Sequence, residues 1–420
     1  MKMSRIVSVI LCIICIFALF SCQKEEDLGI SFVKDKCKEG QITVEISEEG
    51  TGSSIYYGDE NGAILPKFSS IAKECEAGTI ENIVLPANAK TLVLQKHDYA
   101  KIVPIPSEYI IDDVKGITFG ALSDVHYNRY DTSGGDDATL YFEKALDYLD
   151  TLNIDLVGIS GDITTNGERR SLVSYNEAIK DRNYPVLTVS GNHDVVSLGT
   201  GLWQKIMNQN VEGCVFAENN LDFIYDNDKN QEGVFVFLNQ VRWDYYKEGA
   251  TLLNEEQLVW LENVLKEYKD ETVYLFFHSL LCGDDGEKHT GVGNIKNEHG
   301  VTYDIPYTYG ASDEVVFRRL LQEYKNVVFF SGHSHWMFEM ECYNEKANYS
   351  NFDGKYCHMV HVPSVTSPRY VGKDDTSRSS RNGEYSQGWL VEDYQGYIIL
   401  TPIDFISDTY YTEYMEIIYK

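Results

Sequence analysis

Val186-Leu187-Thr188-Val189-Ser190-Gly191-Asn192-His193-Asp194 is the stretch from which the fold of this chain is best inferred. Its apolar start, bounded by a glycine, is typical of a buried strand. An amide, an imidazole and a carboxylate then follow in a row, on the turn that leaves this strand. Because Asn, His and Asp are also common turn residues, the stretch alone leaves an ordinary turn and a functional site equally open.

Four other apolar runs of the chain end in side chains of the same kinds. These ends are Asp124-Val125-His126, Gly161-Asp162, His278 and Gly332-His333-Ser334-His335. Together with the first stretch they hold half of the ten histidines. The carboxyl ends of strands in α/β sheets lie at one edge, where ligands and catalytic groups gather. A single residue of this kind is most often a turn former or a structural hydrogen-bond donor, but five such endings rarely arise by chance and predict a functional site.

The chain from Ile117 onward alternates predicted strands with predicted helices, which indicates a layered α/β unit. Helical spacing of apolar residues predicts helices at about 137–152, 170–181 and 313–324, and a further helix after an N-cap at Asn254. Apolar runs predict strands at 117–122, 154–160, 186–189, 234–238, 273–277 and 327–330. We expect strands of the tail, such as 398–400, to complete a second sheet. The weakly periodic segments 195–230 and 283–309 are expected to form surface loops near the site.

The region before this unit has a different pattern. Short β-like runs separated by Gly, Pro and Asn extend from about Ile30 to Asp113, with no long helical period. This predicts a small all-β, sandwich-like domain, in which we find no site chemistry. We therefore place the small domain at 36–113 and the α/β domain at 114–420.

The side chains at the five strand ends are suited to binding metal ions. Carboxylate and amide oxygens together with several imidazoles favour Mn, Fe or Zn over calcium, which prefers oxygen ligands alone. Two metals about 3.5–4 Å apart can share a bridging carboxylate and a bridging water. Residues i and i+2 on extended backbone point to one face, so Asp124 with His126, and His333 with His335, are expected to converge.

The order of these motifs resembles that of the calcineurin-like metallophosphoesterase superfamily. The motifs are Asp-x-His, Gly-Asp-x4-Gly, Gly-Asn-His-Asp, His and Gly-His-x-His, and the resemblance is close over about Ile117–Trp336. It implies a four-layer α/β/β/α sandwich that holds two divalent metal ions. One metal would be held by Asp124, His126, Asp162 and His335. The second would be held by Asp162, Asn192, His278 and His333, with Asp162 as the bridge.

The resemblance also implies catalytic roles near the metals. His193 would bind no metal; it would stabilise the transition state or protonate the leaving oxygen, an acid role that needs an imidazolium near neutral pH. Serine/threonine phosphatases of the superfamily carry an Asp-Arg pair in the second motif, where this chain has Thr165 and Asn166. Asp194 or an unidentified acid would therefore have to orient His193. Purple acid phosphatases have a tyrosine at the position of Thr165, and Asp-x-Gly as the first motif.

The implied reaction is hydrolysis of a phosphoester by a metal-bridging hydroxide, without a covalent intermediate. The remaining resemblance is to bacterial phosphodiesterases of the cyclic-nucleotide type and to envelope phosphoesterases, and it leaves monoesters and diesters equally open as substrates. The alternative is a catalytically inactive scaffold that binds a ligand as an envelope lipoprotein. An intact set of seven metal ligands argues against that alternative.

The N-terminal sequence predicts that the protein is located in the cell envelope. Residues 1–21 have the form of a lipoprotein signal peptide, in which Lys2 and Arg5 precede the apolar run Ile6–Phe20. Leu19-Phe20-Ser21-Cys22 resembles a lipobox, so a lipid on Cys22 would anchor the protein to a membrane that it does not span. Residues 22–35 would form a tether, and its start, Gln23-Lys24-Glu25-Glu26-Asp27, resembles a surface-export tag of lipoproteins.

The net charge and the cysteines limit the expected partners and disulfides. Several further residues are weaker candidates for contact with substrate. A formal net charge of −29 repels polyanions, so we expect no nucleic-acid binding. Six cysteines remain once Cys12 and Cys15 of the signal peptide and Cys22 are set aside, and none of the six forms a CxxC motif. Buried free thiols are the default, and Cys342 with Cys357 is the first pair to test for a disulfide. The loop 303–309, rich in tyrosine, could stack a base or pack as a lid. Candidate substrate contacts are Arg242, Trp243, Lys288, His289, His299 and Arg369.

Overall fold

The computed structural model of the chain divides into two compact units, residues 1–112 and residues 113–420. The structure describes residues 29–111 except 98, 115–127, 135–195, 211–226 except 220, 233–241, 252–279, 312–339, 356–370, 379–380 and 384–420, with isolated positions between 201 and 207. Each unit is described by itself. None of the helices in this part of the chain has the length and apolar character needed to cross a membrane.

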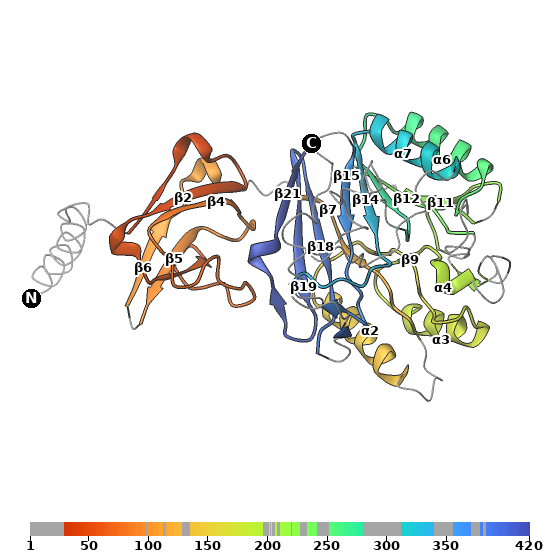
Figure 1. Ribbon diagram of the computed structural model, residues 1–420, viewed down its shortest axis with the longest axis horizontal. Coiled ribbons are helices and arrows are strands. Elements are labelled where there is room, and N and C mark those ends of the chain that lie inside the picture. The colour runs from red at the N-terminus through yellow and green to blue at the C-terminus, as the bar shows by residue number, and fades with distance from the viewer. Residues whose placement is uncertain are drawn as a thin grey trace, which may run out of the picture. The chain divides into compact units, whose positions relative to one another are not determined.

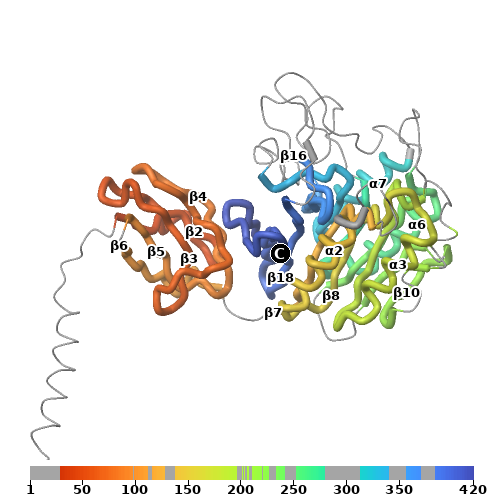
Figure 2. The backbone as a smooth tube through the Cα atoms, turned by 90° about the horizontal axis from the view of Figure 1, so that it is seen from below, coloured from red at the N-terminus to blue at the C-terminus, as the bar shows by residue number. Residues whose placement is uncertain are grey.

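The first unit contains two small antiparallel sheets, seen in Figure 2. One sheet has the order β1-β2-β4 and the other β3-β5-β6. The hydroxyl of Tyr57 in β3 donates a buried hydrogen bond of 2.5 Å to the carbonyl oxygen of Val84 in β4, and so links the two sheets. The expected all-β N-terminal domain is therefore confirmed. The strands are β1 (Ile30–Phe32), β2 (Gln41–Ile46), β3 (Ser54–Gly58), β4 (Gly78–Val84), β5 (Thr91–Lys96) and β6 (Tyr99–Pro104).

The second unit contains a large mixed sheet whose central strands lead into the site. β7 (Lys115–Leu122), β8 (Leu156–Ile159) and β9 (Val186–Thr188) run parallel, in that order. The C-terminal strands, which we expected to complete a second sheet, instead extend this one by antiparallel pairing of β18 with β7. The added strands are β18 (Gln387–Tyr394), β19 (Tyr397–Asp404), β20 (Thr409–Tyr410) and β21 (Glu416–Tyr419).

A second large sheet has the order β10-β11-β12-β13-β14-β15 among the described residues. Its strands from β12 to β15 are parallel, and β10 and β11 form an antiparallel hairpin at one edge. The strands are β10 (Cys214–Phe216), β11 (Phe223–Tyr225), β12 (Val234–Phe237), β13 (Val273–Phe276), β14 (Val327–Ser331) and β15 (His358–His361). A short pair, β16 (Arg369–Tyr370) with β17 (Ser379–Ser380), lies outside both sheets.

Helices cover the outer faces of the two sheets, as Figure 1 shows. α6 (Glu255–Glu267) and α7 (Ser312–Glu323) bury leucine and phenylalanine side chains against the sheet of β12–β15. α2 (Gly135–Leu149) and α3 (Arg169–Ile179) belong to the other sheet, with Leu149 of α2 packed close to Gly120 of β7. The predicted four-layer α/β/β/α sandwich is confirmed.

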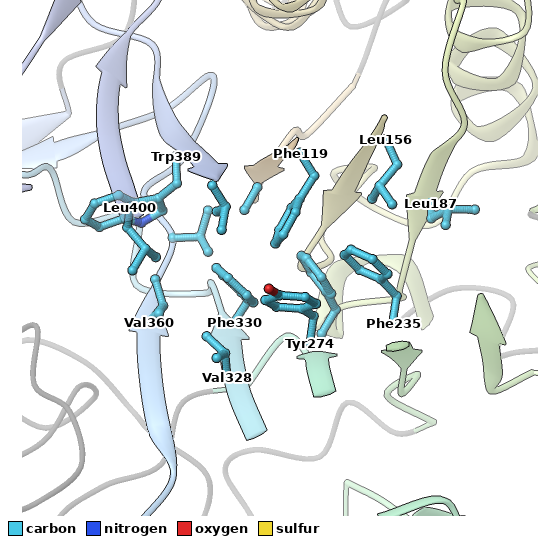
Figure 3. Close-up of a cluster of buried hydrophobic side chains, with 14 of the residues drawn as sticks. Phe119, Leu156, Leu187, Phe235, Tyr274, Val328, Phe330, Val360, Trp389 and Leu400 are labelled. Atoms are coloured by element: carbon cyan, nitrogen blue, oxygen red, sulfur yellow. The ribbon is translucent and has the colours of Figure 1, made fainter. Parts of the chain in front are cut away.

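Aromatic side chains fill the space between the two large sheets (Figure 3). Phe119 of β7 packs edge-on against four rings of the facing sheet, with centroid distances of 5.0 Å to Phe235, 4.9 Å to Tyr274, 5.8 Å to Phe330 and 6.3 Å to Phe276. Such edge-to-face pairs add to the stabilisation that burial of the rings already provides. This packed core fixes the spacing of the two sheets, and therefore of the loops at their carboxyl edges.

Most of the predicted elements agree with the structure. The N-cap predicted at Asn254 is confirmed, since its side chain accepts a hydrogen bond from the Gln257 amide in a capping box. The expectation of an unbroken loop at 195–230 is wrong, because β10 and β11 lie within it. These strands are three residues each and are joined by a polar turn, so they are too short for a clear alternating pattern. The segment expected as a loop at 283–309 lies outside the described residues.

Candidate metal centre

All seven residues predicted as metal ligands come together at the carboxyl ends of strands in both large sheets. Their ligand atoms form two groups that share one carboxylate, and within each group the atoms lie within 4.8 Å of one another. Asp124, His126 and Asp162 follow β7 and β8, whereas His278, His333 and His335 follow β13 and β14. The first group is Asp124, His126, Asp162 and His335, and the second is Asp162, His278 and His333.

In the first group, nitrogen and oxygen atoms that carry lone pairs lie close to one another. Nε2 of His335 lies 3.1 Å from Nε2 of His126 and 3.1 Å from Oδ1 of Asp124. The other oxygen of Asp124, Oδ2, accepts hydrogen bonds from the Ser123 hydroxyl and the His333 amide. Oδ1 is buried and receives no hydrogen bond. A buried carboxylate oxygen facing imidazole nitrogens is a costly arrangement unless a cation lies between them, so this group fits a metal ion.

Asp162 lies between the two groups. Its Oδ2 is 3.2 Å from Nε2 of His278 in the second group and 3.9 Å from Nε2 of His126 in the first. Its Oδ1 accepts a hydrogen bond of 2.9 Å from the backbone amide of His193. Because one oxygen is held by the backbone, the other faces both groups, which is the position a bridging carboxylate requires.

Asn192 completes the second group. Its side-chain oxygen lies 3.0 Å from Nε2 of His278 and 3.1 Å from Nδ1 of His333. Asn192 begins α4 (Asn192–Val195), a single turn that starts where the chain leaves β9. The stretch Val186–Asp194 therefore brings the amide oxygen to the two imidazoles.

Backbone carbonyls orient two of the metal-binding imidazoles. Nδ1 of His278 lies 2.7 Å from the Ser160 carbonyl oxygen, and Nδ1 of His335 lies 2.9 Å from the Ser367 carbonyl oxygen. Donation from Nδ1 leaves Nε2 of each ring directed at the centre of the site. This arrangement is common around metal-binding histidines, because it fixes both the tautomer and the plane of the ring.

The backbone of the ligands differs from our expectation. We expected extended backbone to bring Asp124 and His126 to one face, and likewise His333 and His335. All four instead have positive φ, at 52°, 45°, 73° and 64°, and so does Asp162 at 52°. The pairs do converge, but through left-handed turns at alternate residues. Such conformations are unfavourable for side chains other than glycine and are concentrated at functional sites.

Two glycines leave room for the carboxylates. A Cβ atom at Gly332 would lie 1.7 Å from Oγ of Ser123 and 2.6 Å from Oδ2 of Asp124. A Cβ atom at Gly191 would lie 2.1 Å from Oδ1 of Asp162. The glycines of these two motifs are therefore needed for close approach to the two acids.

Charge within the site is distributed unevenly. Burial favours the neutral form of His278, but the charge of Asp162 outweighs this and raises the pKa of His278 to about 9. Burial and the neighbouring His335 lower the pKa of His126 to about 3. Burial and His278 lower the pKa of His333 to about 3 as well. In the absence of metal, His278 and Asp162 thus form a buried ion pair, and a metal in the second group would displace the proton on His278.

His193 lies beside the metal-binding residues but belongs to neither group. Its ring is 5.0 Å from that of His126, and both rings are at the more open side of the site. Nδ1 of His193 lies 2.6 Å from the carbonyl oxygen of Thr165. A backbone carbonyl therefore occupies the place where we expected an acid to orient this imidazole.

Asp194 has a different environment from the one we expected. Its carboxylate accepts hydrogen bonds from the backbone amides of Ile163, Thr164 and Gly191, and from the Thr164 hydroxyl. Burial and the charge of Asp162 raise the pKa of Asp194 to about 7. The carboxylate holds the loop after Asp162 in place, and the orienting role that we assigned to it falls to the Thr165 carbonyl.

Two further strand ends support the site and were missed in the sequence. Asn239 and Gln240 follow β12, and their hydrogen bonds reach Ser190 and Ser279 beside the ligands. Ser364 and Thr366, which follow β15, donate hydrogen bonds to the carbonyl oxygen of Asp124. The signal was an apolar run that ends in polar residues, as at the other five ends, but amides and hydroxyls are weaker indicators of metal chemistry.

The weaker candidates are only partly covered by the structure. Arg369 lies beside the last ligand motif, where its amide donates a hydrogen bond of 2.7 Å to the His335 carbonyl oxygen. Cys357 is a buried free cysteine, and its expected partner Cys342 lies outside the described residues. The other candidate contacts also lie outside the described residues: Arg242, Trp243, Lys288, His289, His299 and the loop 303–309.

Taken together, the sandwich and its two carboxylate–histidine groups define a dinuclear metallohydrolase type of site. The chain belongs to the calcineurin-like phosphoesterase family, whose model matches residues 117–337, more than half of the chain. A protein of Arcobacter nitrofigilis named "Probable glycerophosphodiester phosphodiesterase" is 29% identical over 127 residues. That match covers 30% of this chain and 41% of the relative, so the chain spans less than half the length of this relative.

Solved structures with related folds have low sequence identity to this chain. A dimetal phosphatase from Danio rerio is 14% identical, with a TM-score of 0.49, over 73% of this chain and 99% of that one. A purple acid phosphatase from yellow lupin (Lupinus luteus) is 14% identical, with a TM-score of 0.45, over 89% of this chain and 72% of that one.

Proposed function

We propose that this chain hydrolyses phosphoesters with the help of two divalent metal ions. The observation that carries the proposal is the pair of donor groups that share Asp162. Oxygen and imidazole donors of this kind suit Mn, Fe or Zn. When bound, two such ions would supply positive charge to the phosphate oxygens and lower the pKa of an attacking water.

Residues of the chain would bind the two ions and determine the side from which substrate approaches. Asp162 would be a ligand of both ions, and Asn192 would contribute a neutral oxygen to the second. His126 keeps 13% of its side chain exposed, whereas His278 is fully buried, so substrate would approach from the side of His126. The ring of His193 lies on that same side.

His193 would act as the general acid. Donation from Nδ1 to the Thr165 carbonyl fixes the ring and leaves Nε2 as the atom that can carry a second proton. As the bond between phosphorus and the leaving oxygen breaks, that oxygen gains the electron pair and takes the proton from Nε2. The imidazole becomes neutral and regains its proton from water.

Phosphodiesters are the substrate class that we favour. The relative from Arcobacter nitrofigilis carries the name of a phosphodiesterase, and its 29% identity to this chain covers 127 residues. We also propose that the mature protein is a lipoprotein anchored through Cys22 at the cell envelope, which rests on the signal-like run Ile6–Phe20. A Cys22→Ser variant that still incorporates labelled lipid would contradict the anchor.

The test is a substrate panel on protein loaded with Mn²⁺. A bis-aryl phosphate, an aryl phosphate, cyclic nucleotides and glycerophosphodiesters would be compared, with Asp162→Asn as the matched control. We expect turnover of at least one diester, and its loss in the Asp162→Asn variant. Protein that binds two Mn²⁺ ions but turns over no member of the panel would favour the alternative, a ligand-binding scaffold without activity.

A further inference from the structure

Asn239 and Gln240 form a buried polar junction behind the metal centre. They follow β12, and both side chains are fully buried. Buried amides are costly unless their hydrogen bonds are satisfied, so these contacts must be specific. Neither residue belongs to either group of metal-binding atoms.

The junction reaches from one large sheet to the other. Ser190, which follows β9 in the opposite sheet, donates its backbone amide to Oδ1 of Asn239 at 2.8 Å. The Ser190 hydroxyl donates to the backbone carbonyl of Gln240 at 2.8 Å. Because Ser190 lies two residues before Asn192, these bonds fix the start of the turn that carries this ligand.

Gln240 also holds the neighbouring strand end. Its side-chain oxygen Oε1 accepts a hydrogen bond of 3.0 Å from the hydroxyl of Ser279. Ser279 directly follows His278 and is itself fully buried. Gln240 is therefore bonded to Ser190, two residues before Asn192, and to Ser279, directly after His278. Asn192 and His278 face each other in the second group.

The first group has a separate support. The hydroxyls of Ser364 and Thr366 donate to the carbonyl oxygen of Asp124 at 2.8 Å and 3.1 Å. Nδ1 of His335 donates to the Ser367 carbonyl oxygen. Gln240, in contrast, is bonded to Ser190 and Ser279, which precede Asn192 and follow His278. Asp162 is shared by both groups, but the other ligands of the two metal positions thus have different supports.

We propose that Gln240 is a positioning residue that sets the affinity of the second metal site and leaves that of the first site nearly unchanged. The side chain of Gln240 would act through Ser279, which directly follows His278, while its backbone carbonyl, unchanged in a side-chain variant, holds Ser190. The inference rests on the proposed two-metal centre but not on hydrolysis. Loss of a partner that bonds a metal ligand directly weakens metal binding about 10–100-fold, and we expect the lower end of this range for Gln240, which acts one residue further out.

The experiment is a Mn²⁺ titration of metal-free protein, followed by calorimetry and by electron paramagnetic resonance of the bound ions. Wild type is expected to bind two ions and to show the coupled signal of a dinuclear centre. Gln240→Leu is expected to bind the first ion normally and the second at least about tenfold more weakly. Thr366→Val, the matched control, should weaken the other ion.

Double variants assign the effect to one site. In a His278→Ala background, which lacks the second site, Gln240→Leu is expected to change the remaining affinity by less than about twofold. In a His335→Ala background, which lacks the first site, Gln240→Leu is expected to weaken the remaining ion at least about tenfold. Equal effects in the two backgrounds, or none in either, would overturn the inference.

Ser279→Ala is the second variant, for the case in which Gln240→Leu does not fold. It removes the same side-chain hydrogen bond by deleting one oxygen atom, and the same pattern in the two backgrounds is expected. Failure of the proposed function would be seen separately, as two bound Mn²⁺ ions without turnover of any phosphoester.

Discussion

Nδ1 of His193 lies 2.6 Å from the carbonyl oxygen of Thr165. A carbonyl oxygen accepts a hydrogen bond but carries no full charge, so it fixes the ring without the electrostatic contribution of a carboxylate. Where we expected an acid to orient this histidine, the loop after Asp162 provides its backbone instead. This relationship makes His193 and Asp194 separable by mutation.

His193→Gln should lower kcat by about 10²–10⁴-fold and leave the metal content at the wild-type value. The loss should be larger for alkyl than for nitrophenyl leaving groups, because a nitrophenolate needs no proton from an acid. Steady-state kinetics on matched esters, with elemental analysis of the same samples, would measure this. An equal loss for both leaving groups would contradict an acid role.

Asp194→Asn should act mainly on stability. Backbone N–H groups, including those of Ile163 and Gly191, now donate hydrogen bonds to the Asp194 carboxylate. In the variant, some of these groups would face the NH2 group of the new asparagine, which cannot accept them. Unsatisfied buried donors cost about 1–3 kcal/mol each, so urea denaturation of the metal-free variant should show a loss of this order. Thr164→Val is the milder control, because it removes one hydroxyl that donates a hydrogen bond to the same carboxylate. Unchanged stability with a large fall in kcat would instead restore Asp194 as a catalytic residue.

Gly332→Ala should disturb the first metal group. The added methyl would clash with Ser123 and with Asp124, at 1.7 Å and 2.6 Å from their oxygens. Gly396→Ala is the matched control, because no atom lies within 4 Å of a Cβ atom at that turn. We expect a lower melting temperature and weaker Mn²⁺ binding for Gly332→Ala alone. Similar melting curves for the two variants would show that the loop moves aside at little cost.

His361 should make the fold sensitive to acid. Burial lowers its pKa to about 3, and its Nε2 contacts the Ser334 hydroxyl. Because this pKa is about 6.5 in an unfolded chain, the unfolded state binds more protons between pH 6.5 and pH 3. The stability that the neutral ring provides is present above pH 6.5. It is lost as the pH falls, by up to about 1.4 kcal/mol per pH unit.

The measurement for His361 is the free energy of unfolding at several pH values between 7 and 4. His361→Gln should show a shallower loss than wild type over this range, since it removes one titrating group. Parallel pH curves for the two proteins would mean that His361 is not buried in its neutral form.

Metal removal should lower the stability of the second unit. Ions that bind only the folded state stabilise it by about 2.7 kcal/mol when their concentration is a hundred times Kd. Addition of a chelator should therefore lower the melting temperature, and Mn²⁺ should restore it. Asp162→Asn, which alters the shared ligand, should melt at one temperature with or without Mn²⁺.

Side-chain chemistry at strand ends could be predicted from the sequence, whereas backbone roles could not. Asp162 and His278 were recognised because five apolar runs of this chain end in acids, amides or imidazoles, a combination that rarely arises by chance. The carbonyl of Thr165 has no sequence signature, since every residue carries one. Gln240 was missed for a related reason: an amide after a strand is ordinary unless its partners are known.

Local conformation was also beyond the reach of the sequence pattern. The positive φ angles of Asp124 and His333 are imposed by the surrounding loops; Asp and His are enriched at such angles but adopt them too rarely for the sequence to predict them. The hairpin of β10 and β11 forms because a neighbouring strand, β12, offers an edge, which is a property of the packed sheet and not of three residues.

Each metal group takes ligands from both large sheets. His126 and His335 belong to one group although 209 positions of the sequence separate them. Neither group can exist before the two sheets have packed, so metal loading should be one of the last events in folding. Once in place, an ion would act like a covalent cross-link between distant segments, most valuable where the closed loop is longest. Chelation should therefore speed unfolding more than it slows refolding, because the ions join only after the transition state.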